Sequence, residues 1–178
     1  MEAMSTHPDS HPPLFNSPLE TGLRALIILE AFHPRPCDLT EMTWFDHLVV
    51  HTADLDGLHD TPAPESLHPD LPARTGELLV RRSLVEESLR LMQQVHLVDA
   101  VPSNEGIHFV ASDEAPSFLD LLQAPYTRDL KHRARWIAER FAGRPSEEIG
   151  ALVAARIGRW TAEFHAPEAA GTARDNRP

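Results

Sequence analysis

Cysteine is almost absent from this chain of 178 residues, since Cys37 is its single example. One cysteine cannot form a disulfide within the chain, which is typical of proteins from a reducing compartment. Long apolar runs are also missing, because no stretch approaches the ~18 residues that a membrane-spanning helix needs. The first residues, MEAMSTHPDSHPP, have neither the basic start nor the apolar centre of a signal peptide. We therefore expect a cytoplasmic protein with no membrane partner.

Sequence motifs of catalysis are missing as well. The 8 glycines form no glycine-rich phosphate loop, and no serine lies in a G-x-S-x-G nucleophile elbow. With 11 histidines in the chain, a pairing of Cys37 with one of them is easily imagined by chance. We expect no enzymatic activity and no cofactor, and we assign no catalytic, cofactor-binding or metal-binding residue.

Two histidines have a spacing that metal sites use. His47 and His51 lie four residues apart, so one face of a helix could present both to a zinc ion, with Asp54 and His68 completing the site. Zinc enzymes of this type carry a glutamate beside the first histidine, where this chain has a leucine. We favour the interpretation that both histidines lie on a half-buried face beside Trp44. A metal-dependent enzyme is a secondary alternative.

Positive charge is scarce. The chain has 16 lysines and arginines against 27 aspartates and glutamates, which gives a net charge of -11. Residues 1–74 carry 12 acidic and 3 basic side chains, residues 75–127 carry 8 and 3, and residues 128–178 carry 7 and 10. Most of the chain would therefore repel a phosphate backbone, and the last third alone could tolerate one.

Helical patterns dominate what is present. Ser17, Pro18 and Glu20 form the capped start of a first helix. Asp38 and Glu41 form a similar cap for a second helix, which is predicted to end near residue 52. After a proline-rich loop at 52–74, apolar spacing predicts a third helix at about 77–96. A hairpin follows, with strands at 97–101 and 107–110 around a turn at 102–106, and with Ile107 and Phe109 facing inward. Further helices are predicted at about 112–123, 125–143 and 146–164.

This order predicts a mainly α fold with a small β-hairpin, namely a winged-helix-like domain followed by a C-terminal helical extension. We place the winged-helix-like domain at 16–111, with its long loop at 52–74, and the extension at 112–164. Flexible tails are expected at 1–15 and 165–178.

A winged helix is best known for binding DNA through its third helix. Here Glu86 and Glu87 dilute the arginines of that helix, and the hairpin tip carries Asn104 and Glu105 but no base. Direct recognition of DNA by this helix is therefore disfavoured. A winged-helix DNA-binding transcription regulator is kept as the alternative function.

Contacts with other proteins are expected from two basic regions. One surrounds the start of the third helix, and the other is a helix face later in the chain; the residues are Arg74, Glu77, Arg81 and Arg82, and Arg128, Lys131 and Arg135. Trp160 and Phe164 are further candidates, although a stripe at helical spacing is more often core.

Several ordered blocks resemble one protein family. These are FNSPLETGLRALIILEAF, WFDHLVVHTAD, ESLHPDLPARTGELLVRRSLVEESLRLM, SFLDLLQAPYTRDLKHRARWIAERF and IGRWTAEF. Together they cover about residues 14–164 and resemble the type-2 middle component of bacterial ABC-three-component systems, the middle subunit of Lamassu-type antiphage defence.

The resemblance implies a small accessory subunit of winged-helix type. Its expected partners are an SMC-like ABC ATPase that senses foreign DNA and an effector, often a nuclease. It implies that the subunit joins the effector to the ATPase and restrains it until activation, and that DNA is reached only through the complex. The resemblance implies no catalytic residue.

Overall fold

The computed structural model describes residues 17–57, 62–69 and 75–157, without the side chains of residues 75–79 and 156–157. Within these ranges the chain is mainly helical with one small three-stranded sheet, which confirms the predicted fold class. The elements are α1 (Pro18–Phe32), β1 (Cys37–Asp38), α2 (Leu39–Leu48), α3 (Thr75–Gln94), β2 (Val98–Ser103), β3 (Gly106–Ala111), α4 (Ala115–Asp120), α5 (Pro125–Phe141) and α6 (Ser146–Ile157). The order from α1 to β3 is compatible with a winged helix.

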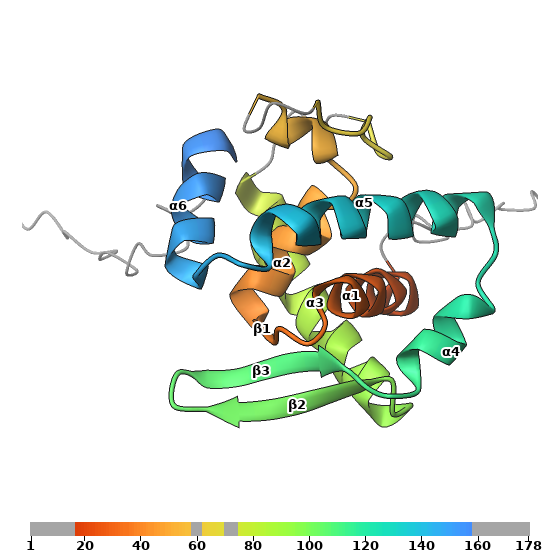
Figure 1. Ribbon diagram of the computed structural model, residues 1–178. Coiled ribbons are helices and arrows are strands. Elements are labelled where there is room, and N and C mark those ends of the chain that lie inside the picture. Colours follow the sequence, from red (N-terminus) through yellow and green to blue (C-terminus); the bar gives the residue numbers. More distant parts are fainter. Residues whose placement is uncertain (1–16, 58–61, 70–74, 158–178) are drawn as a thin grey trace, which may run out of the picture.

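Helix α1 lies at the centre of the molecule, with α3, α4 and α5 packed around it (Figure 1). Its start follows the predicted cap, because Ser17 Oγ accepts a hydrogen bond of 3.2 Å from Glu20 N and Pro18 occupies the first turn. Leu26, Ile28 and Leu29 are all at most 1% exposed. A helix that is apolar on almost every face is stable only when neighbours cover it on every side.

Helix α2 begins with the predicted capping box. Asp38 Oδ1 accepts a hydrogen bond of 2.8 Å from Glu41 N, and the Glu41 carboxylate accepts one of 3.2 Å from Asp38 N. The helix ends at Leu48, earlier than predicted, and a short 3-10 helix, η2 (Thr52–Leu55), follows it.

The described part of the proline-rich loop, residues 62–69, is attached to the helices. The amides of Leu67 and His68 donate to the Val50 carbonyl over 2.9 and 3.1 Å. The Arg133 guanidinium on α5 donates to the Glu65 carbonyl over 2.9 and 2.7 Å. These bonds hold the segment against the end of α2 and against α5.

The sheet has the strand order β1–β3–β2, and both pairs are antiparallel. Ser103 pairs with Gly106, so the turn consists of two residues and is shorter than predicted. Gly106 has a φ of +128°, a conformation that favours glycine. Pro102 lies within β2 and lacks an amide hydrogen, which an edge strand tolerates.

The hairpin differs from its prediction at one apolar residue. Phe109 is 8% exposed, as expected for an inward side chain, but Ile107 is 61% exposed. The two residues lie on the same face of β3, because residues two apart in a strand share a face. The hairpin runs along one edge of the molecule (Figure 1), and Ile107 lines an open groove between the hairpin, α2 and α3. The inward prediction for Ile107 is therefore wrong.

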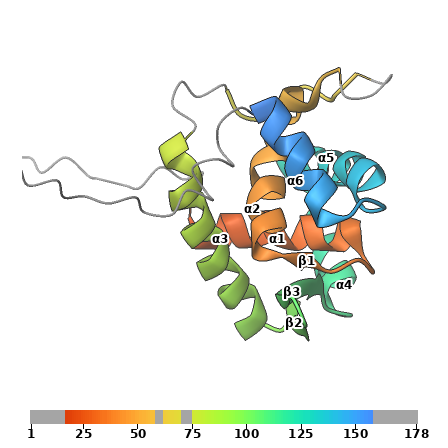
Figure 2. The ribbon, with the colours of Figure 1, turned by 90° about the vertical axis from the view of Figure 1, so that its left-hand side faces the viewer.

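The last two helices close the core from the side opposite α3, as Figure 2 shows. Leu130, Ala134, Ile137 and Phe141 of α5 are buried as predicted, and Ile149 and Val153 of α6 join the same cluster. Buried side chains before and after residue 111 form one core, and the proposed domain division there stays a prediction. Trp160 and Phe164 lie outside the described residues. Among the residues that the structure describes, no helix is long and apolar enough to cross a membrane.

Candidate interaction surfaces

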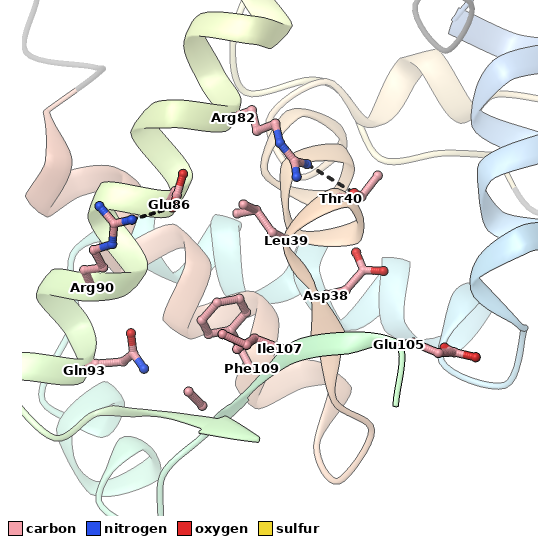
Figure 3. A pocket seen from close by; sticks show the side chains of 11 residues that line it. Asp38, Leu39, Thr40, Arg82, Glu86, Arg90, Gln93, Glu105, Ile107 and Phe109 are labelled. Carbon is pink, nitrogen blue, oxygen red and sulfur yellow. Dashed lines mark hydrogen bonds and ion pairs between the residues drawn. The ribbon is translucent and has the colours of Figure 1, made fainter. Parts of the chain in front are cut away.

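A groove of about 450 Å³ lies between α3, the start of α2 and the hairpin (Figure 3). We call it the α3–hairpin groove. Leu39, Ile107 and Phe109 give it an apolar lining. Its charged lining comes from all three elements, namely Asp38, Arg82, Glu86, Arg90 and Glu105.

Both arginines of this groove have partners within the fold. Arg90 Nη2 lies 2.5 Å from Glu86 Oε1, and Arg82 Nη1 donates to Thr40 Oγ1 over 3.1 Å, as Figure 3 shows. A DNA-reading winged helix would place this face against phosphates and bases. Here the groove has more acidic than basic side chains, and its bases are partly neutralised.

A second groove, of about 390 Å³, lies between α1, α4 and α5. We call it the α4–α5 groove. Ile27, Ala31 and Leu119 line it with apolar atoms, while Glu30, Asp120, Lys131 and Arg135 supply charges of both signs. Lys131 Nζ donates to the carbonyls of Leu119 and Leu122 over 2.5 and 3.1 Å, so it ties the end of α4 to α5.

The structure separates the predicted contact residues of the third helix. Arg74 lies outside the described residues, and so does the side chain of Glu77. Arg82 is half-buried at the α3–hairpin groove, whereas Arg81 is buried inside the fold. The expected cluster around the start of α3 is therefore divided between surface and core.

Arg81 belongs to a buried group of charges centred on Asp46 of α2. Asp46 Oδ2 lies 2.5 Å from Arg81 Nη1, and Asp46 Oδ1 lies 2.8 Å from Arg24 Nε on α1. Burial alone would raise the pKa of Asp46, but the two guanidinium groups outweigh it and hold this pKa below its usual value. One carboxylate thus joins three helices, which the sequence pattern did not indicate.

The predicted histidine pair lies inside the fold. The rings of His47 and His51 stack with centroids 4.5 Å apart, and both residues are buried. His47 Nε2 lies 2.9 Å from Asp54 Oδ2, and His68 Nε2 lies 3.0 Å from Tyr126 Oη. Among the described residues, no group of three or more His, Cys, Asp or Glu side chains could hold a metal ion. His47 and His51 pack against each other, while His47 links α2 to η2 and His68 links the loop to α5.

Burial has a strong effect on two titratable groups. Burial, with a smaller effect of neighbouring His47, lowers the pKa of His51 to about 4, so the imidazole is neutral at pH 7. Burial also raises the pKa of Cys37 to about 12, so its thiol stays protonated and is a poor nucleophile.

Glu41 makes further contacts beyond its capping box. Its carboxylate lies 2.5 Å from Arg35 Nη2 and accepts a hydrogen bond from the Ser146 hydroxyl at the start of α6. Arg35 also donates to the Arg144 carbonyl over 3.4 Å. The capping motif was visible in the sequence, but the link to α6, more than a hundred residues later, was not.

Comparison with known proteins places this chain in a family. Neither the curated proteins nor the solved structures gave a match to the chain. The family model described as ABC-three component (ABC-3C) system Middle Component 2 matches residues 14–163. That range spans most of the chain and agrees with the resemblance of residues 14–164. The chain therefore belongs to the family of middle component 2 of ABC-three-component systems.

Proposed function

We propose that this chain is a non-catalytic bridging subunit of a Lamassu-type antiphage defence complex. In this proposal it joins an SMC-like ABC ATPase to an effector such as a nuclease and restrains the effector until the ATPase engages foreign DNA. Membership in a middle-component family supports an accessory role among partner proteins.

The observation that carries the proposal is the presence of two grooves built from different elements. The α3–hairpin groove uses α2, α3 and the hairpin, whereas the α4–α5 groove uses α1, α4 and α5, and no described residue lines both. A subunit that joins two proteins needs two separate contact surfaces. Each groove combines an apolar lining with charges of both signs, the composition of many protein interfaces.

The distribution of charge favours protein partners over DNA. The chain has a net charge of -11, and the groove beside α3 contains more acidic than basic side chains. Binding to DNA depends on unpaired cations that replace counterions along the phosphates. The alternative of a transcription regulator therefore finds no support in this groove.

The proposal is tested by co-expressing the tagged chain with the ATPase and the effector of its operon. We expect all three to co-purify, and we expect the ATPase and effector to separate when this chain is left out. Equal association of those two subunits without this chain would overturn the bridging role. Tight, salt-sensitive binding of the isolated chain to a DNA duplex would instead support the transcription regulator.

A further inference from the structure

We propose that the exposed face of α5, together with the α4–α5 groove, is the docking surface for an acidic helix of a partner protein. This inference rests on the proposed function, since it assigns one of the two surfaces that a bridging subunit needs. It also specifies the chemistry of the segment that binds there.

The first observation concerns how the arginines are used. Among the arginines whose side chains the structure describes, nearly all donate hydrogen bonds or form ion pairs within the fold. The exceptions within this described set are Arg128 and Arg135, which are both exposed on α5. In a chain of net charge -11, two cations without internal partners on one helix are available to a ligand.

The second observation is the spacing of these two residues. They lie seven residues apart, so they share one face of α5 about two turns, or roughly 10 Å, apart along the helix axis. His132 is exposed between them on the same face. A partner helix lying along α5 would match both guanidinium groups with carboxylates that are also seven residues apart.

The third observation is an apolar anchor site beside Arg135. Arg135 lines the α4–α5 groove, whose apolar lining includes Ile27 and Leu119. Leu121, at the end of α4, is 77% exposed, more than any other large hydrophobic residue in the described part of the chain. Because Lys131 holds α4 against α5, the groove is formed before a partner arrives. A partner helix could thus bury an apolar side chain there while its carboxylates meet the arginines.

The surroundings favour an acidic protein segment over nucleic acid. Glu30 and Asp120 line the same groove, and Asp129 and Glu139 are exposed on α5. These carboxylates would repel a continuous phosphate backbone, and two phosphate contacts alone give weak, salt-sensitive binding. A folded partner can instead place its own carboxylates opposite the arginines and avoid the acids.

The experiment measures binding of the full chain to the purified ATPase and to the purified effector, at low and at high salt. We expect one of the two subunits to lose about tenfold or more in affinity for the Arg128→Glu/Arg135→Glu variant, with a weaker salt dependence. The Arg128→Lys/Arg135→Lys variant keeps both charges and should bind within about twofold of the wild type. Circular dichroism of each variant checks that the fold is intact.

The outcomes separate this inference from the proposed function. If both subunits bind the wild type and the double Glu variant equally well, the docking surface is wrong and the bridging role stands. If neither subunit binds the wild type, both proposals are overturned. A photo-crosslinker in place of Leu121 should react, in the assembled complex, with a partner segment that carries carboxylates seven residues apart. Crosslinking to DNA instead would overturn the acidic-helix assignment.

Discussion

Arg81 on α3 and Asp46 on α2 form an ion pair inside the fold, with Arg81 Nη1 2.5 Å from Asp46 Oδ2. Arg24 on α1 holds the other carboxylate oxygen. Two guanidinium groups around one carboxylate compensate the burial of all three, so the position of α3 against the core depends on this group of charges.

Arg81→Met should destabilise the protein by about 3 kcal/mol, because removal of one partner leaves a buried charge less compensated. The measurement is the free energy of unfolding in urea. Arg82→Met is the matched control, since this neighbouring arginine is half-buried and donates to Thr40. We expect this control to lower the free energy of unfolding by less than about 1 kcal/mol. Equal losses in the two variants would show that the buried ion pair contributes no more to stability than the contact of Arg82.

The stability of the fold should fall as the pH is lowered from about 6.5 toward 4. The pKa of His51 is lowered from 6.5 to about 4 in the fold, so the unfolded chain binds the proton more readily over that window. The contribution of neutral His51 is fully present above pH 6.5 and is lost as the pH falls toward 4. His51→Gln should flatten the pH dependence of the unfolding free energy. An equally steep pH dependence in the His51→Gln variant would contradict the assignment.

Glu41→Ala should loosen α6, because the Glu41 carboxylate pairs with Arg35 and accepts a hydrogen bond from the Ser146 hydroxyl. We expect faster amide hydrogen exchange over residues 146–155, together with a loss of about 2 kcal/mol for the charged hydrogen bonds of this half-buried pair. Glu147→Ala changes an exposed carboxylate on the same helix and should do neither. Unchanged exchange in α6 of the Glu41 variant would count against this link.

Gly150→Ala should destabilise the protein, although alanine normally stabilises a helix by about 1 kcal/mol relative to glycine. A Cβ at Gly150 would lie 2.8 Å from Cη2 of Trp44, a rigid ring that is 7% exposed. Either the ring or α6 must move, so the thermal midpoint should fall and the tryptophan fluorescence should change. Gly143→Ala meets no atom within 4 Å and serves as the control, with a midpoint equal to or above that of the wild type. A midpoint that rises in both variants would exclude the clash.

Most of the helices could be predicted because their signals are local. The caps at Ser17 and Asp38 involve residues three positions apart, and the stripe on α5 repeats at helical spacing. The exposure of Ile107 could not be predicted, because alternation gives the face of a strand and not whether a helix covers that face. The sequence predicted only part of the candidate surfaces, because it does not show which side chains are buried. Neighbouring Arg81 and Arg82 look alike in the sequence, but Arg81 lies in the core and Arg82 lines a groove.

The sequence by itself determined the mainly helical fold, the acidic balance and the family resemblance, since these depend on composition, local spacing and ordered blocks of residues. Tertiary structure alone decided which charges are available. Asp46 forms ion pairs with Arg24 and Arg81. Glu41 forms an ion pair with Arg35 and accepts a hydrogen bond from Ser146, and the Glu65 carbonyl accepts hydrogen bonds from Arg133. Pairing of charges is a matter of distance in space, and these partners are separated in the chain. The sequence already grouped Arg128 and Arg135 with Lys131, and the structure adds that Lys131 donates to carbonyls within the fold while these two arginines stay exposed on α5.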